Sequence, residues 1–295
     1  MKQQEISSLT EKELQELLTE ALQAFPEKPE QSIKQEWLKK YKLAKLWPDG
    51  YELCKALCDL PDDILNDPKI SGRFLYSNIS TLRKGKFFLL EFSPDVDPDL
   101  SNNLPLCSEI RKWSANKCGN AYVCENWDIL PGEHKIQKSV QELCTTIGSG
   151  LNITRQVCAS NLIFCRSEKT DNALEKWGGY LKDFLRIHEA ILKIVKPSCI
   201  FAIGARKDER ENNTYRIVKN FLGFSDIKDI TFPSGHWNYS CFVVEEHCKQ
   251  LNQQIKLIGV PDFSRFVLDI QALEWIAKEC RKSVTKSRRN ASKHP

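Results

Sequence analysis

The stretch that decides the fold is Ala159-Ser160-Asn161-Leu162-Ile163-Phe164-Cys165-Arg166-Ser167, in which a short apolar run opens on an amide and closes on a cation and a hydroxyl. Such a run is typical of a buried strand, and the ends of buried strands present side chains to ligands. Two other segments, 88–95 and 257–266, have the same form. We therefore expect three strand ends of similar character.

From about Gly72 onward, apolar strands alternate with amphipathic helical segments. The predicted strands are 86–92, 159–165, 199–203, 240–245 and 256–260, and the longest helices between them are 136–147 and 173–195. This alternation predicts a three-layer α/β/α fold around a central, mostly parallel sheet. Ligands of such sheets bind beyond the carboxyl ends of the strands. If the strands are neighbours, the following segments surround one cleft: 93–97, 161–167, 204–206 and 261–265.

The chain divides into three regions by pattern. Residues 1–75 read as a helical N-terminal region, with a helix capped near Thr10 and further helices at 31–46 and 51–60. Residues 76–280 form the α/β domain. Residues 281–295 are basic and without apolar period, which favours a disordered tail.

Composition narrows the function classes. The 43 Lys and Arg against 39 Asp and Glu give a net charge of +4, so a nucleic-acid surface must be a local patch. No stretch approaches the roughly 20 apolar residues of a membrane span, and Met1–Ser8 lacks the form of a signal peptide. We expect a cytoplasmic monomer that does not bind membranes and has reduced cysteines.

Known cofactor motifs are missing from the chain. Its twelve cysteines include no CxxC pair, so we expect no metal and interpret them as small buried hydrophobes. Neither a GxxxxGK[ST] loop nor a GxGxxG follows any strand, and GxSxG and HExxH do not occur. We expect no organic cofactor, and a site built from carboxylates, hydroxyls, an amide and an arginine.

The order of these elements resembles the uracil-DNA glycosylase superfamily over roughly Gly72 to Ala277. The resemblance rests on a strand ending in Phe92-Ser93-Pro94-Asp95, the later strand with Asn161, the strand 196–204 after a long helix, and the Pro-x-x-Ser-Arg loop 261–265. The segment Tyr122-Val123-Cys124-Glu125-Asn126-Trp127-Asp128, followed by Gln137, also looks like uncharacterised bacterial relatives of that superfamily.

The resemblance implies roles for individual residues. In the superfamily the turn after the first strand orients the attacking water. Ser93 stands where Asp or Asn is usual, so the carboxylate would be Asp95 or Asp97. Asn161 matches the amide that reads the edge of a flipped base. Ser264 matches a phosphate-binding serine.

Asp262 departs from the pattern, because the superfamily normally has a histidine there. An ionised carboxylate would repel a departing base that gains negative charge. Asp262 would instead accept a hydrogen bond from an exocyclic amino group, stabilise the sugar cation, or act as a general acid with a raised pKa. Each option favours an amino-bearing or modified pyrimidine over uracil.

A base inside a duplex must be flipped out and stacked on an aromatic side chain. Phe92, Phe164 and Trp127 are the candidates, and simple core packing is the alternative for each. His236, in a Gly- and Pro-punctuated loop, either faces the cleft or is structural. Arg166, Arg206 and Arg265 are expected to meet phosphates, and the basic tail either adds salt-dependent DNA affinity or is merely solvated.

The sequence thus predicts a DNA glycosylase with Asp95, Asp97 and Asp262 as catalytic candidates and a modified pyrimidine as target. Glucosylated 5-hydroxymethylcytosine in phage DNA, and hence antiviral defence, fits the resemblance. Three alternatives stay open: a repair glycosylase for uracil or damaged bases, a non-catalytic nucleic-acid-binding module, and a nucleoside-processing hydrolase.

Overall fold

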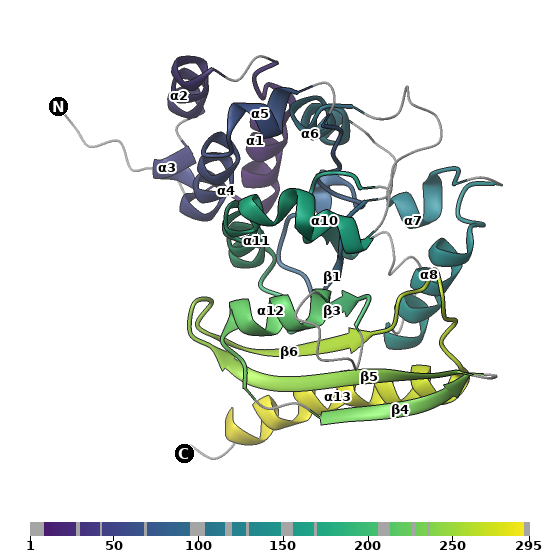
Figure 1. Cartoon of the computed structure of the whole chain (residues 1–295). Coiled ribbons are helices and arrows are strands. Elements are labelled where there is room, and N and C mark those ends of the chain that lie inside the picture. The colour runs from purple at the N-terminus through teal and green to yellow at the C-terminus, as the bar shows by residue number, and fades with distance from the viewer. Residues whose placement is uncertain are drawn as a thin grey trace.

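A six-stranded sheet forms the centre of the molecule, in the order β2-β1-β3-β6-β5-β4 (Figure 1). The computed structural model describes residues 9–27, 30–41, 43–67, 70–94, 104–115, 120–127, 130–148, 156–167, 170–205, 213–225, 228–234 and 237–291. Its strands are β1 (Phe87–Glu91), β2 (Cys158–Asn161), β3 (Cys199–Ile203), β4 (Lys228–Ser234), β5 (Trp237–Cys248) and β6 (Gln253–Val260). Strands β2, β1, β3 and β6 pair in parallel, whereas β5 and β4 are antiparallel additions. The prediction of a mostly parallel sheet is confirmed.

Two strand predictions need correction. Strand β2 ends at Asn161, because the chain then turns to pair with the segment before β1, through bridges such as Gly72 to Cys165. Residues 162–165 are as buried as a central strand. Their apolar run indicates this burial and does not by itself indicate strand pairing. Strand β4 was not predicted, since an edge strand with exposed Lys228, Asp229 and Thr231 has no continuous apolar run.

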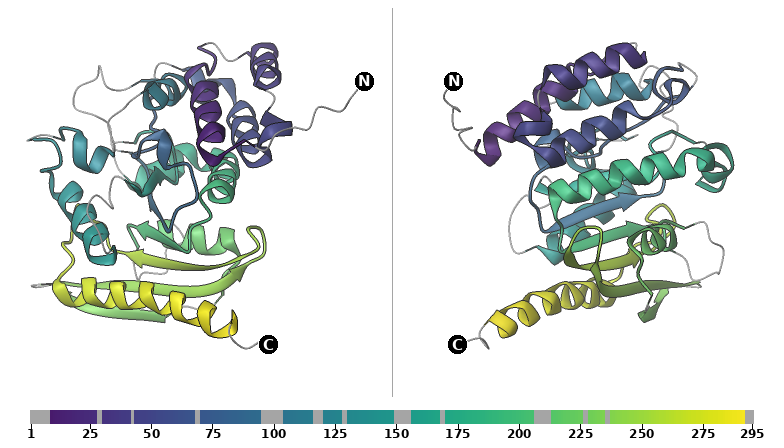
Figure 2. Two further views of the ribbon diagram at one scale, coloured as in Figure 1. Left: turned by 180° about the vertical axis from the view of Figure 1, so that it is seen from behind. Right: turned by 90° about the vertical axis from the view of Figure 1, so that its left-hand side faces the viewer.

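Alternation along the strands separates two cores. On β1, Phe88 and Leu90 belong to one core, which we call the upper core, and Phe87 and Leu89 belong to the other, the lower core. The upper core is covered by α6 (Leu106–Ala115), α10 (Thr170–Trp177), α11 (Leu181–Val195) and α12 (Thr214–Leu222). The lower core is covered by α7 (Ala121–Cys124), α8 (Lys135–Ile147) and α13 (Ile270–Ala291). The result is three layers, with helices on both faces of the sheet (Figure 2).

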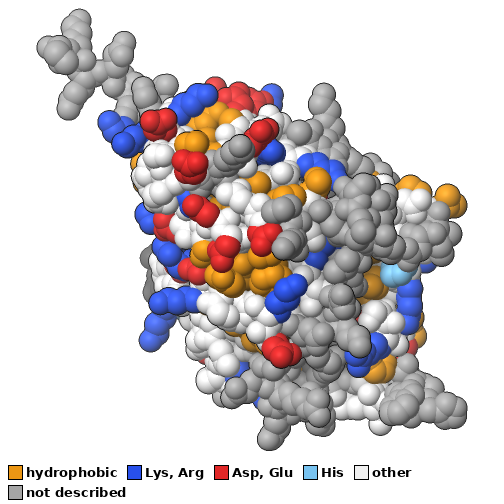
Figure 3. Space-filling model, turned by 45° about the horizontal axis from the view of Figure 1, so that its top comes forward, with side chains coloured by type: hydrophobic (Ala, Val, Ile, Leu, Met, Phe, Trp, Pro, Cys, Tyr) orange, Lys and Arg blue, Asp and Glu red, His pale blue; other side chains and the backbone are white. Residues whose placement is uncertain are grey.

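The N-terminal region is helical and packs onto the upper side of the molecule. It comprises α1 (Glu11–Gln23), α2 (Gln31–Lys40), α3 (Leu43–Leu46), α4 (Pro48–Cys58) and α5 (Asp62–Asn66), with a 3₁₀ turn η1 (Ile79–Thr81) after them. The predicted cap of the first helix is confirmed, because Thr10 and Glu13 form a reciprocal capping box. Apolar residues of this region share the upper core with α11 and the sheet, so the helices are continuous with the α/β domain. Figure 3 shows acidic and basic side chains interspersed on the face that carries these helices.

The two longest predicted helical segments differ from the structure. The segment 173–195 is broken into α10 and α11 by a 3₁₀ turn, η3 (Gly178–Tyr180), whose two glycines disfavour a continuous helix. The basic stretch predicted to be disordered is helical as far as Ala291, as the end of α13. No glycine or proline interrupts the sequence from Ile270 to Ala291, so nothing stops a helix that is anchored by its first turns. Within the described residues, no helix is long and apolar enough to cross a membrane.

Gly259, near the end of β6, leaves no room for a side chain. A Cβ atom there would lie 2.6 Å from Tyr215 Cδ2 and 2.9 Å from the Ala205 Cβ. We expect Gly259→Ala to lower the free energy of unfolding by about 1–3 kcal/mol, because overpacking forces α12 away from the sheet. Urea unfolding measures the change. The matched control is Gly179→Ala, where nothing lies within 4 Å. Equal stability of the two variants would contradict the prediction.

Candidate functional site

The carboxyl ends of four parallel strands lie along one edge of the sheet. The chain leaves β1 to one side to form β2 and then returns past it to form β3, so the strand order reverses between β1 and β3. Ligands of open α/β sheets bind in the crevice at such a reversal, outside the carboxyl ends. The turn after β1 lies at this crevice, and the end of β2 is on the neighbouring strand.

Backbone hydrogen bonds join the turn after β1 to the segment after β2. The Leu162 N–H donates to Glu91 O over 2.7 Å, and the Ser167 N–H donates to Pro94 O over 3.1 Å. Glu91 and Asn161 are register partners on adjacent parallel strands. These contacts place the segment 91–94 beside the segment 161–167.

Asn161 is the most informative side chain at this edge. It is 0% exposed, and neither Oδ1 nor Nδ2 has a hydrogen-bond partner. A buried amide normally has partners, because an unpaired polar group costs about 1–3 kcal/mol. Asn161 lies two residues after Ala159 and therefore on the same face of β2, where Ala159 packs in the lower core with Tyr76 and Tyr122.

Glu91 is a site residue that sequence reasoning missed. It ends β1, and alternation places its side chain on the face of Leu89, which is also the face of Asn161. Burial raises the pKa of the Tyr122 phenol well above its ordinary value, and the nearby Glu91 carboxylate adds to that rise. The clue in the sequence was a single acidic residue closing the apolar run 87–92.

Three aromatic rings form a cluster on this face, which we call the aromatic cluster: Tyr76, Tyr122 and Trp127. The Tyr76 and Tyr122 rings stack with centroids 5.0 Å apart, and Trp127 meets them edge-on at 5.7 and 5.6 Å. Trp127 is the one predicted stacking residue that the structure places beside Asn161's face of the sheet. Tyr76 is tied to β2 directly, since its N–H donates to Ala159 O over 2.9 Å.

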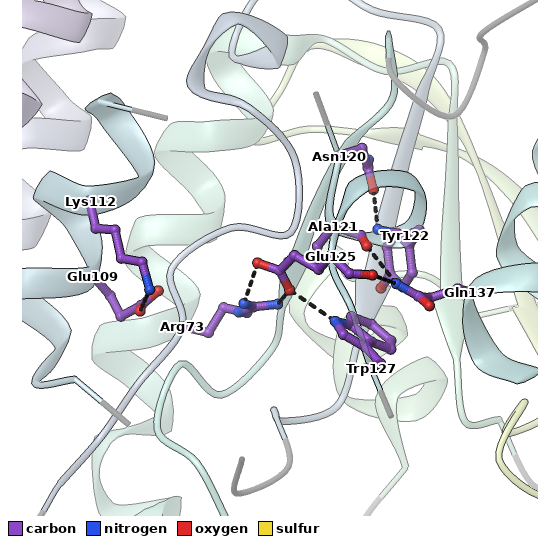
Figure 4. A network of polar contacts seen from close by, with 9 residues as sticks. All are labelled: Arg73, Glu109, Lys112, Asn120, Ala121, Tyr122, Glu125, Trp127 and Gln137. Carbon is purple, nitrogen blue, oxygen red and sulfur yellow. Dashed lines mark hydrogen bonds and ion pairs between the residues drawn. The ribbon is translucent and has the colours of Figure 1, made fainter. Parts of the chain in front are cut away.

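A partly buried ion pair lies against the aromatic cluster (Figure 4). Both terminal nitrogens of Arg73 bond to the Glu125 carboxylate at 2.8 Å, and Glu125 Oε2 also accepts from Trp127 Nε1 at 2.9 Å. The Arg73 guanidinium stands 4.8 Å over the Tyr76 ring. Burial opposes ionisation of Glu125, but the Arg73 charge outweighs it and the pKa of Glu125 is lowered. The pair stays charged and fixes the position of Trp127.

Helix α8 is hydrogen-bonded to the segments 121–127 and 130–132. Gln137 is fully buried and its Nε2 donates to Ala121 O and Glu125 O, at 2.8 and 2.9 Å. Gln141 Nε2 donates to Tyr122 O and Gly132 O, at 2.7 and 2.8 Å. These bonds leave the aromatic cluster little freedom, which is what preorganised binding requires.

Two predicted stacking residues lie elsewhere. Phe92 is 6% exposed and Phe164 is 0% exposed, and both pack in the upper core, on the opposite face of the sheet from Asn161. Phe164 is enclosed by Phe74, Phe184 and His188. Both phenylalanines are packed in the hydrophobic core, which is the alternative that the sequence left open for them.

His188, on α11, supports the end of β2 from the upper side. Its Nε2 bonds to Asn161 O at 2.8 Å and to Leu162 O at 3.3 Å, so this nitrogen carries the proton and donates. Burial lowers the pKa of His188 from 6.5 to about 4, against the opposing effect of these two hydrogen bonds. The neutral imidazole thereby fixes the peptide that carries Asn161.

This histidine predicts a pH dependence of stability. Between pH 6.5 and about 4 the unfolded chain binds a proton at His188 that the folded chain does not, so stability is complete above 6.5 and falls as the pH drops. The loss reaches about 3 kcal/mol, at about 1.4 kcal/mol per pH unit. Urea unfolding at several pH values measures it. His188→Gln, which retains a donor but does not titrate, is expected to flatten the profile over this window; an unchanged profile would exclude His188 as its source.

Asp262 accepts hydrogen bonds within the turn that follows β6. Its Oδ1 accepts from the Ser264 N–H at 2.9 Å and from Ser264 Oγ at 2.7 Å, and its Oδ2 lies 3.7 Å from Arg265 Nε. Strands β1 and β3 lie between the ends of β2 and β6, so the strand end that carries Asn161 is about 14 Å from the end of the strand that Asp262 follows. The Ser264 donors expected to bind a phosphate are directed at Asp262 instead.

The predicted phosphate contacts differ in exposure. The Arg265 side chain is 59% exposed, beside a loop that Lys135 also reaches through a 3.1 Å bond to Ser264 O. Arg166 is only 9% exposed, and its contact with a phosphate stays a prediction. Its segment is drawn inward by pairing with the chain before β1, where its N–H donates to Ser71 O.

Four predicted site residues lie outside the described residues: Asp95, Asp97, Arg206 and His236. Within the described part, no group of three or more His, Cys, Asp or Glu residues could hold a metal ion. The cysteines of this part are free, and all except Cys124 are buried.

Comparison with known proteins gives no relative from which a role could be transferred. No family model, no curated protein and no solved structure matches the chain.

Proposed function

We propose that this protein is a DNA glycosylase that hydrolyses the bond between a modified pyrimidine and deoxyribose and leaves an abasic site. The observation that carries the proposal is the Asn161 amide, fully buried and without a hydrogen-bond partner at the end of β2. An amide offers an acceptor and donors side by side, and the pairing edge of a pyrimidine offers the complementary set. A flipped base would supply the hydrogen bonds that the protein does not.

The aromatic cluster supports the same reading. Tyr76, Tyr122 and Trp127 lie on the Asn161 face of the sheet and are held by the ion pair of Arg73 and Glu125. Enzymes that act on flipped bases hold the base between aromatic or apolar side chains while polar groups read its edge. A planar ligand fits a site with this combination of rings and one free amide.

Carboxylates at the end of β1 would supply the chemistry. Breaking the bond builds positive charge on the sugar, which a nearby carboxylate stabilises while it orients water. Asp95 and Asp97 are the candidates by resemblance. Glu91 joins them, because it is the register partner of Asn161 and shares its face.

The loop after β6 would contact the DNA backbone. Arg265 and Lys135 are exposed cations on this loop and beside it. The apolar side chains of Val267 and Ile270 are 50% and 66% exposed. Cations that neutralise phosphates, together with apolar side chains that enter the base stack, are typical of proteins that open a duplex. In this proposal Asp262 shapes the loop that presents Arg265.

The proposal is tested by incubating the purified protein with DNAs that carry unmodified, hydroxymethylated or glucosylated cytosine, and with uracil-containing DNA. Abasic sites are counted and released bases identified by mass spectrometry. We expect base release from a modified-cytosine DNA, and its loss in Asp95→Asn, Asp97→Asn or Glu91→Gln. Release from uracil DNA alone would indicate a repair enzyme. If no DNA yields abasic sites but free nucleosides are cleaved, the DNA substrate is wrong; if neither reacts, the protein is not a glycosylase.

A further inference from the structure

Glu109, on α6, is a second buried polar group that the proposed chemistry does not use. It is 1% exposed, and its Oε2 has no hydrogen-bond partner. Its ionic contact is with Lys112, whose Nζ lies 3.9 Å from Oε1 and whose side chain is 53% exposed. Few proteins bury a carboxyl oxygen without a partner, because the desolvation cost is uncompensated. Glu109 therefore points to a ligand in the same way as Asn161 does.

The surroundings of Glu109 connect it to the candidate site. Arg73 lies beside it, and Figure 4 shows Arg73 between Glu109 and Trp127. The same guanidinium stands over Tyr76, whose backbone bonds to β2 two residues before Asn161. The charges of Lys112 and Arg166 also act on Glu109. Burial raises the pKa of Glu109 above its ordinary value, although the charges of Arg73, Lys112 and Arg166 act against that rise.

Backbone bonds hold this corner together. The Gly72 N–H donates to Leu104 O at 3.0 Å, two residues before α6, while Arg166 N–H donates to Ser71 O at 2.9 Å. A Cβ on Gly72 would lie 3.0 Å from both Leu106 Cδ1 and Phe164 O. Helix α6 is thus packed tightly against the segment after β2. The Glu109 side chain is held in a fixed corner next to that segment.

The charges select the chemistry of what Glu109 can bind. An anion such as phosphate would lie next to the Glu109 carboxylate, which offers it no hydrogen-bond donor. A metal ion or an ammonium group would be repelled by Arg73 and Arg166. A neutral hydroxyl suits the position, because it can donate to a carboxyl oxygen and accept from a neighbouring donor.

We infer that Glu109 is a specificity-determining residue, which accepts a hydrogen bond from a hydroxyl-bearing substituent on the base that Asn161 holds. This inference rests on the proposed function and names the substrate class within it: pyrimidines whose substituent carries hydroxyl groups, such as a sugar. A base without that group leaves Glu109 buried and unpaired, which penalises its binding.

The test compares kcat/KM of the wild type, Glu109→Gln and Glu109→Met on glucosylated, hydroxymethylated and unmodified cytosine in otherwise identical DNA. We expect Glu109→Met to lower the preference for the glucosylated over the unmodified base by at least about tenfold, and Glu109→Gln, which retains one acceptor, by less. Glu16→Gln, on exposed α1, is the matched control and should leave the preference unchanged. Thermal unfolding verifies that each variant is folded.

The outcomes separate this inference from the proposed function. If the wild type releases base but both Glu109 variants keep its preference, the inference fails and the glycosylase stands. If they lose activity equally on every base, Glu109 has a general role and the inference fails as well. If the wild type releases no base from any DNA, both the proposed function and the inference about Glu109 fail.

Discussion

Asn161→Leu is expected to reduce kcat/KM for base release by about 10²–10³-fold without reducing stability. The loss follows because the leucine cannot hydrogen-bond to the base. Stability is retained or increased by about 1 kcal/mol, because the variant removes two buried polar atoms that have no partner in the free protein. Base release from the preferred DNA and urea unfolding measure the two effects on the same preparation.

Asn120 provides the matched control, since it is also a buried asparagine but a bonded one. It is 1% exposed, its Oδ1 accepts from the Tyr122 N–H at 2.9 Å and caps α7, and its Nδ2 donates to Val157 O. Asn120→Leu is expected to cost about 2 kcal/mol of stability, because a cap is lost and a buried carbonyl loses a donor. A similar stability loss in Asn161→Leu would show that Asn161 is an ordinary structural residue.

Glu125→Leu is expected to have the largest effect on stability, a loss of about 3–5 kcal/mol. The substitution removes the carboxylate that pairs with the Arg73 guanidinium, whose side chain is only 10% exposed. It also removes the acceptor of Trp127 Nε1, so the aromatic cluster loosens and base release falls with stability. Denaturant unfolding and stopped-time base-release assays follow both quantities.

The double variant Arg73→Met with Glu125→Leu is the decisive comparison. Removing both charges takes away the desolvation cost along with the attraction, so most of the stability is expected to return. Activity is not expected to return, since the cation over Tyr76 and the acceptor for Trp127 are both gone. If the stability loss of the double variant equals the sum of the losses of the two single variants, the loss of charge pairing between Arg73 and Glu125 does not explain the instability of Glu125→Leu.

The sequence predicted the parts of the molecule that local pattern controls. The apolar runs predicted as strands at 86–92, 199–203 and 256–260 correspond to the central strands β1, β3 and β6, and the predicted mostly parallel sheet is confirmed. The capping box of Thr10 with Glu13 could also be predicted, because both partners lie within one helical turn. The strand prediction was wrong where residues are buried but not paired in the sheet, as at residues 162–165.

Only part of the candidate site could be predicted from the sequence, for one physical reason. Asn161 was found because a polar residue interrupts an apolar strand, and that is a property of the sequence itself. Which groups face it depends on contacts between distant segments. Arg73 and Glu125 are 52 residues apart, and Tyr76 meets Tyr122 only because the segment before β1 pairs with β2.

What the sequence determined by itself was the order of strands and helices and the residues at the strand ends, since both follow from period and turn chemistry. Tertiary structure alone decided the order of strands in the sheet and the face each side chain occupies. Strand order placed β1 and β3 between the strand of Asn161 and the strand before Asp262, and alternation placed Glu91 on the same face as Asn161, while Phe92 and Phe164 packed in the upper core. The reason is that pairing between strands is fixed by long-range packing, which no local pattern records.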